Sequence, residues 1–75
     1  MHVSSGFLLL ETAPGREASV LDQLTRFHAV THHSVIYPAA IAVRVEATTG
    51  VDAIAAQLRA LDGVTRTRLY RARHT

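Results

Sequence analysis

The sequence predicts a single α+β domain whose elements follow the order strand, helix, strand, strand, helix, strand. Four segments are rich in apolar or β-branched residues and too short to be helices, and two others repeat apolar residues at helical spacing. Glycine or proline residues separate most of them, and His28-Ala29 separates the first helix from the second strand. Because 75 residues fall within the range of one domain, residues 1–75 are expected to form one unit with a core over about residues 6–71.

The first strand is expected over residues 6–11. Phe7-Leu8-Leu9-Leu10 is a short apolar run, and Thr12-Ala13-Pro14-Gly15 stops it before a helix can form. Both alternating faces of this run are apolar, so the strand should lie in the centre of the sheet and be covered on both sides.

The first helix is expected from Arg16 to Phe27, and the second strand from Val30 to Tyr37. Apolar residues recur at helical spacing in the first segment, at Val20, Leu21, Leu24 and Phe27. The second segment is rich in β-branched residues, and Pro38 stops it.

The second half of the chain repeats the alternation of strand and helix. Residues 41–46 alternate between Ile41, Val43 and Val45 on one face and Ala42, Arg44 and Glu46 on the other, which is the period of a half-buried strand. Thr48-Thr49-Gly50 then provides candidate N-cap residues for a helix with the apolar stripe Val51, Ile54, Leu58 and Leu61. Asp62-Gly63 is expected to end this helix, and the last strand follows over residues 64–71.

A doubled strand–helix–strand unit is the arrangement of the ferredoxin-like fold. The predicted architecture is therefore a four-stranded antiparallel sheet with two helices on one face, of the dimeric α/β barrel type. The other face of such a sheet must meet solvent, a ligand or another chain.

The residues on that second face predict a homodimer. The first strand places either Phe7 and Leu9 or Leu8 and Leu10 there, and an exposed apolar patch on a small domain usually marks an interface. If Ile41, Val43 and Val45 face the helices, then Arg44 and Glu46 point to the open side. We expect a face-to-face dimer interface at Phe7, Leu9, Arg44 and Glu46, in which each charge has a partner. The alternative, that both charges reach water at the rim, stays open.

Composition limits the classes of partner. The chain has no cysteine, which excludes disulfides and thiolate metal sites and leaves oligomerisation as the available support for a small core. The net charge is only +2, and the arginines gather in the last strand, so no direct contact with nucleic acid is expected. Neither a membrane-length apolar run nor a signal peptide is recognisable, which predicts a cytoplasmic protein without a membrane partner.

Candidate chemistry is sparse. His28, His32 and His33 lie close in sequence, but neighbouring residues of a strand point to opposite faces, so His32 and His33 cannot chelate one ion. No set of nucleophile, base and orienting residue is recognisable. We therefore expect no metal, no cofactor, no catalytic residue and no enzymatic activity.

Two segments resemble a known family. The run Phe7-Leu8-Leu9-Leu10-Glu11-Thr12-Ala13-Pro14-Gly15-Arg16-Glu17 resembles the opening strand and turn of the Lrp/AsnC effector-binding domain, also called the RAM domain. Leu61-Asp62-Gly63-Val64-Thr65-Arg66-Thr67-Arg68 resembles the closing segment of that domain, and the resemblance spans about residues 6–70. It implies a free-standing module without a helix-turn-helix, which forms dimers through its sheets and rings of dimers. By analogy it implies a regulatory role in transcription through full-length Lrp/AsnC regulators.

The resemblance also implies a ligand, with an amino acid expected first, at a subunit interface near the turn between the second and third strands. That turn contains Tyr37, Pro38, Ala39 and Ala40 in place of the family's Gly-x-x-Asp-like motif, so a carboxylate is lost and binding is either altered or absent. The hydroxyls of Thr65 and Thr67 in the last strand are further candidates for ligand contacts. A second resemblance, to small chaperones that bind twin-arginine signal peptides, gives the alternative function of peptide binding at the sheet.

Overall fold

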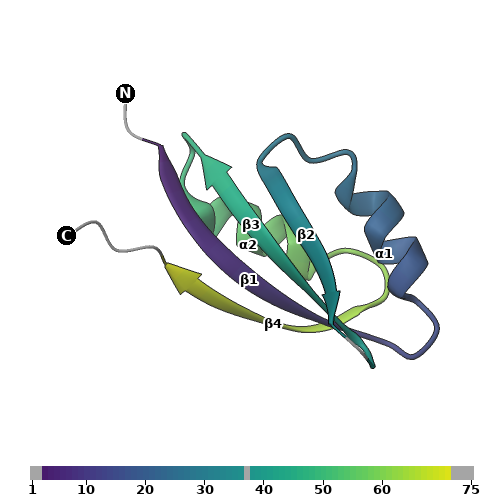
Figure 1. Cartoon of the computed structure of the whole chain (residues 1–75). Coiled ribbons are helices and arrows are strands. Elements are labelled where there is room, and N and C mark those ends of the chain that lie inside the picture. Colours follow the sequence, from purple (N-terminus) through teal and green to yellow (C-terminus); the bar gives the residue numbers. More distant parts are fainter. Residues whose placement is uncertain (1–2, 37, 72–75) are drawn as a thin grey trace.

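The computed structural model describes residues 3–36 and 38–71, and its elements follow the predicted order (Figure 1). The elements are β1 (Ser4–Thr12), α1 (Glu17–Leu24), β2 (Val30–Ile36), β3 (Ala40–Ala47), α2 (Val51–Arg59) and β4 (Val64–Arg71).

The four strands form one antiparallel sheet in the order β2-β3-β1-β4. In Figure 1, α2 lies behind the central strands and α1 lies beside β2. Residues of both helices join β1 and β3 in one apolar cluster, so both helices pack on the same side of the sheet. The predicted ferredoxin-like fold is confirmed, and so is the central position of β1.

The core lies between the helices and the two central strands. Leu8 and Leu10 of β1 pair with Val43 and Ile41 of β3, and directly paired residues point to the same face. All four are at most 1% exposed, and they pack with buried residues of both helices, Val20, Leu24 and Leu58. The alternation along β3 therefore has the predicted direction, with the apolar residues facing the helices.

Both helices end earlier than the sequence predicts. α1 stops at Leu24, because the chain tightens into i→i−3 hydrogen bonds from the N–H groups of Thr25 and Arg26. The hydroxyl of Thr25 also donates to the carbonyl of Asp22, at 2.6 Å. α2 stops at Arg59 in the same way, and Gly63 follows with a φ of 99°, a conformation that favours glycine.

Of the three candidate N-cap residues of α2, the glycine takes that position and the two threonines do not. Gly50 occupies the N-cap position with a φ of 98°, and no side chain forms a capping hydrogen bond there. The threonines that precede it, Thr48 and Thr49, are exposed. Burial of Val51, Ile54 and Leu58 therefore holds this helix in place more than capping does.

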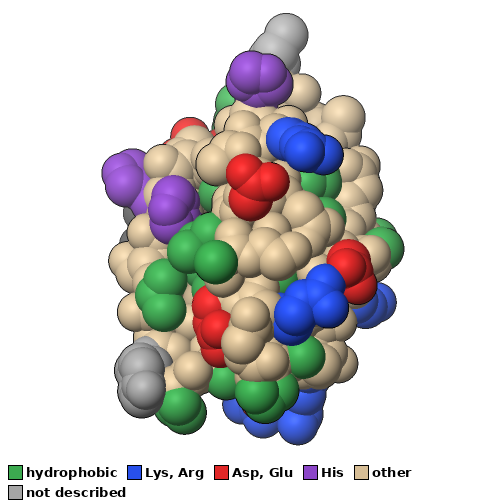
Figure 2. Space-filling view, turned by 90° about the vertical axis from the view of Figure 1, so that its right-hand side faces the viewer, with side chains coloured by type: hydrophobic (Ala, Val, Ile, Leu, Met, Phe, Trp, Pro, Cys, Tyr) green, Lys and Arg blue, Asp and Glu red, His purple; other side chains and the backbone are tan. Residues whose placement is uncertain are grey.

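Polar contacts tie the start of α1 to the turn after α2. Arg16 forms an ion pair with Asp62, and the side-chain amide of Gln23 donates to the carbonyl of Asp62 at 2.8 Å. Figure 2, which views the molecule from the α1 side, shows acidic and basic side chains interspersed rather than separated. No helix among the described residues is long and apolar enough to span a membrane.

The second face of β1 differs from the prediction. No other element of the described chain covers it, and the Phe7 side chain remains 52% exposed. The described part of the chain therefore covers β1 on one face alone.

Candidate ligand site

A cavity of about 540 Å³ lies where the β1–α1 turn meets the β2–β3 turn. The backbone N–H of Thr12 donates to the carbonyl of Ala39 at 2.9 Å, which fixes the two turns side by side. The cavity is lined by Pro14, Gly15, Glu17, Val35, Pro38 and Ala39.

The cavity exists because the helices do not cover this corner of the sheet. Val35 of β2 is paired with Ile41 and therefore faces the helix side. Ile41 is fully buried, whereas Val35 remains 52% exposed. An apolar wall is thus left open beside the first turn of α1.

The lining combines apolar groups with one charge. Pro14, Val35, Pro38 and Ala39 present apolar surface, and Glu17 is the only ionisable residue among the lining residues that the structure describes. The volume falls within the range of small-molecule sites, about 300–1,000 Å³. The arrangement can hold an apolar group against the walls and an ammonium group at the Glu17 carboxylate.

The residues predicted for the ligand site are only partly brought together. Pro38 and Ala39 line the cavity, whereas Tyr37 lies outside the described residues. Ala40 begins β3 opposite Glu11.

The two threonines of the predicted site lie on β4 and do not line the cavity. A register irregularity beside Glu11 interrupts the pairing at Thr65, whose hydroxyl donates to the Glu11 carbonyl at 3.2 Å. Thr67 faces the helix side, and its hydroxyl accepts a hydrogen bond from Arg59 at 3.3 Å. Both hydroxyls are thus already engaged within the chain.

Four lining residues were missed by sequence reasoning. Pro14, Gly15 and Glu17 lie in the segment that resembles the family's opening turn, where they were read as turn and helix residues. Val35 was read as an ordinary strand residue. A useful signal was available, since Glu17 follows the Pro14-Gly15 turn by two residues and therefore begins the helix beside the β1–α1 connection.

The predicted interface residues do share the open face. Phe7 pairs with Arg44, Leu9 pairs with Ala42, and Glu46 follows Arg44 by two residues along β3. Phe7, Leu9, Arg44 and Glu46 therefore all point away from the helices. Arg44 forms an ion pair with Glu46 at 3.0 Å, which gives each charge a partner inside the chain.

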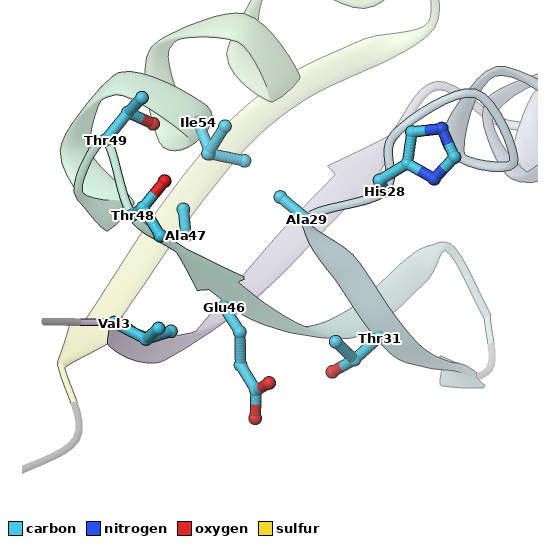
Figure 3. Close-up of a pocket in the computed structure, with 9 residues that line it drawn as sticks. All are labelled: Val3, His28, Ala29, Thr31, Glu46, Ala47, Thr48, Thr49 and Ile54. Atoms are coloured by element: carbon cyan, nitrogen blue, oxygen red, sulfur yellow. The ribbon is translucent and has the colours of Figure 1, made fainter. Parts of the chain in front are cut away.

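A second hollow, of about 410 Å³, lies at the opposite end of the sheet (Figure 3). Ala29, Ala47 and Ile54 form its apolar part. In Figure 3, the Glu46 and Thr31 side chains point to the other side of the sheet from Ile54, and the His28 ring lies apart. Its polar groups do not converge, so it fits a ligand less well than the cavity at the β2–β3 turn.

The histidines of β2 are placed as predicted. His32 pairs with Arg44 on the open face, and His33 pairs with Val43 on the helix side. Among residues 3–36 and 38–71, no three His, Asp or Glu side chains are close enough to hold a metal ion.

The fold defines the class as a ferredoxin-like α+β domain, and solved structures narrow the comparison. The crystal structure of FFRP-DM1 superposes with a TM-score of 0.80 at 27% identity, over 92% of this chain and 97% of that one. FFRP denotes a feast/famine regulatory protein of the Lrp/AsnC family. A hypothetical protein from Pyrococcus horikoshii, PHS023, gives a TM-score of 0.77 at 27% identity, over 99% and 93% of the two chains.

A third structure, PH0061, has a TM-score of 0.75 at 9% identity and supports the fold alone. The match takes in 97% of this chain and 53% of PH0061. No protein-family model and no curated protein matches the sequence. The structural neighbours are consistent with an Lrp/AsnC-like domain.

Proposed function

We propose that this chain is a non-enzymatic regulatory module of the Lrp/AsnC effector type, which binds a small molecule and assembles through its open sheet face. The similarity to FFRP-DM1 over nearly the whole of both chains supports the class. The cavity at the β2–β3 turn supports ligand binding, because it lies where the resemblance places the effector. The module would act through a full-length Lrp/AsnC regulator, as a homodimer or a ring of dimers.

The Glu17 carboxylate carries the proposal for an amino acid. The carboxylate of the family motif is absent from the β2–β3 turn, and Glu17, the first residue of α1, supplies one to the same cavity. An ammonium group gains a charge-assisted hydrogen bond there, while a branched apolar side chain packs on Val35 and Pro38. Because the described lining residues include no Lys, Arg or His, the ligand's carboxylate would face solvent or a neighbouring subunit.

Thermal unfolding with three related compounds tests this assignment. Leucine and 3-methylbutylamine carry the ammonium group, and 4-methylpentanoate lacks it. The first two should stabilise the protein by about 2.7 kcal/mol at 100 times their Kd, and the third should not. Glu17→Gln should abolish the effect, whereas Asp22→Asn, on an exposed position of the same helix, should preserve it. Equal stabilisation by all three compounds would contradict the role of Glu17.

The alternative function is peptide binding, and β2 is the feature that favours it. Val30 is half-buried and the other six residues of this edge strand are exposed, so its free edge can accept an added strand. Charge argues against a twin-arginine peptide, however, because arginines outnumber carboxylates on the neighbouring open face. Light scattering separates the two functions, since a chain that stays monomeric at high concentration would favour the peptide partner.

A further inference from the structure

The outer edge of β4 is open to a partner chain. β4 is the last strand in the order β2-β3-β1-β4, so it pairs with β1 on one side, and no strand of the described chain lies on its other side. An edge strand presents unpaired N–H and C=O groups there, with which an extended peptide can form hydrogen bonds. This edge extends over the eight residues Val64–Arg71.

Two arginines beside this edge differ from the others that the structure describes. Arg59 and Arg68 form no ion pair with a described residue, whereas each of the remaining described arginines forms one. Those paired arginines are Arg16, Arg26, Arg44, Arg66 and Arg71. Within residues 3–36 and 38–71, two positive charges near β4 therefore have no counter-charge.

The two guanidinium groups lie on opposite sides of the edge. Arg68 pairs with Leu9, whose side chain is on the open face of the sheet. Thr67 pairs with Leu10 and faces the helices, and its hydroxyl accepts a hydrogen bond from Nε of Arg59 at 3.3 Å. Both arginines are exposed. Neighbouring positions of β4 thus present one positive charge on each side of the sheet.

A second copy of this chain offers no matching strand. β1 and β3 lie inside the sheet, so the open edges of the described sheet belong to β2 and β4. β2 contains no carboxylate, and the charged side chains of β4 are all arginines. Pairing β4 with another β4 would set like charges against each other. A negatively charged strand from a different protein suits both the edge and its arginines.

We propose that the β4 edge binds an extended segment of another protein that contains two consecutive acidic residues. Consecutive side chains of a strand point to opposite faces, so one carboxylate reaches Arg68 and the next reaches Arg59. Backbone hydrogen bonds to β4 hold the segment, and the arginines select its sequence. The edge lies at the side of the sheet rather than on its face, so this binding does not depend on the proposed dimer.

Two peptides of the same composition test this alternation. Both consist of threonine, valine and two glutamates; the glutamates are consecutive in one peptide, and in the other a single residue separates them, so that both carboxylates point to one face. Titration into the isotope-labelled protein, followed by NMR, should shift the amide signals of β4. The consecutive pair should give a Kd at least about threefold lower. Equal affinities, or shifts on β2 instead of β4, would overturn the proposal.

Charge reversal tests the two arginines. Arg68→Glu and Arg59→Glu should each raise the Kd of the consecutive-glutamate peptide at least about fivefold, because an attraction becomes a repulsion. Arg26→Glu makes the same change of net charge at an exposed position after α1 and should leave the Kd unchanged. Circular dichroism checks that each variant is folded. A folded Arg68→Glu or Arg59→Glu variant that keeps the original Kd would contradict the assignment.

The backbone contacts need a test of their own, because exposed arginines also attract nucleic acid. Alternate N–H groups of an added strand face the edge, so two peptides are methylated at one or the other alternate set of backbone nitrogens. One set should abolish binding, and the other should leave it unchanged. Equal effects of the two sets, or equal affinity for a thymidine oligonucleotide, would reveal an unspecific anion patch and overturn the proposal.

Discussion

The two faces of β1 show how one short strand serves two environments. Its helix-side residues, Leu8 and Leu10, are at most 1% exposed and belong to the apolar core cluster, whereas Phe7 on the other face is 52% exposed beside Arg44 and Tyr70. The first face is completed by the chain itself. The second face is left uncovered by every other element that the structure describes. Apolar character alone therefore does not tell a core residue of β1 from an exposed one, whereas strand pairing assigns each residue to a face.

The largest expected effect compares substitutions on these two faces. Leu8→Ala should lower the free energy of unfolding by about 2–5 kcal/mol, because it leaves a cavity in a packed core. Phe7→Ala should cost the monomer less than about 1 kcal/mol, since the ring is already half in water. Urea denaturation at low protein concentration measures both values. Similar losses for the two variants would show that the faces are not different in the monomer.

The turn after α2 is tightly packed against the start of α1, and Gly63 lies at the point of contact. At Gly63 an added Cβ would lie 3.1 Å from the Cβ of Arg16 and from Cγ2 of Val20, at a φ of 99°. Gly63→Ala should therefore destabilise the protein by about 2 kcal/mol, through backbone strain and crowding together.

Gly15→Ala is the matched control for that substitution. Gly15 also has a positive φ, of 79°, but no atom lies within 4 Å of an added Cβ. It should cost only the conformational part, about 1 kcal/mol. Equal Tm losses for the two variants would mean that crowding at Gly63 contributes nothing.

The smallest expected effect concerns Thr12, the buried polar residue at the end of β1. Thr12 is 5% exposed, and its hydroxyl has no hydrogen-bond partner among the described residues. Thr12→Val keeps the shape and removes the unsatisfied group, so it should stabilise the protein by about 1 kcal/mol. Thr67→Val, which removes an acceptor used by Arg59, should not stabilise it. Loss of stability in Thr12→Val would indicate that the hydroxyl is satisfied in solution.

Sequence alone predicted the fold because the local patterns agreed with one another. The alternation at Ile41, Val43 and Val45 assigned the faces of β3, and Gly63 marked the reversal before β4. The ends of the helices were harder, since a single hydrogen bond from Thr25 and the competition between i→i−3 and i→i−4 bonds decide them.

The candidate site was predicted only in part. Pro38 and Ala39 were identified through the resemblance, but Glu17 and Val35 come from other elements. These residues line one cavity because the Thr12–Ala39 hydrogen bond holds the two turns together and because α1 leaves Val35 of β2 exposed. Neither feature produces a local pattern in the sequence. A cavity is the space that packed side chains leave unfilled, and its position cannot be predicted from amino-acid composition.

The antiparallel pairing of β1 with β4 also determines where attachments to the domain can be made. β1 begins at Ser4 and β4 ends at Arg71, close to the Gly6–Arg71 pair at one end of the sheet, and the cavity lies at the other end (Figure 1). A reporter or tether joined before Ser4 or after Arg71 would leave the mouth of the cavity clear. Both attachment points thus lie on one side of the domain, away from the cavity.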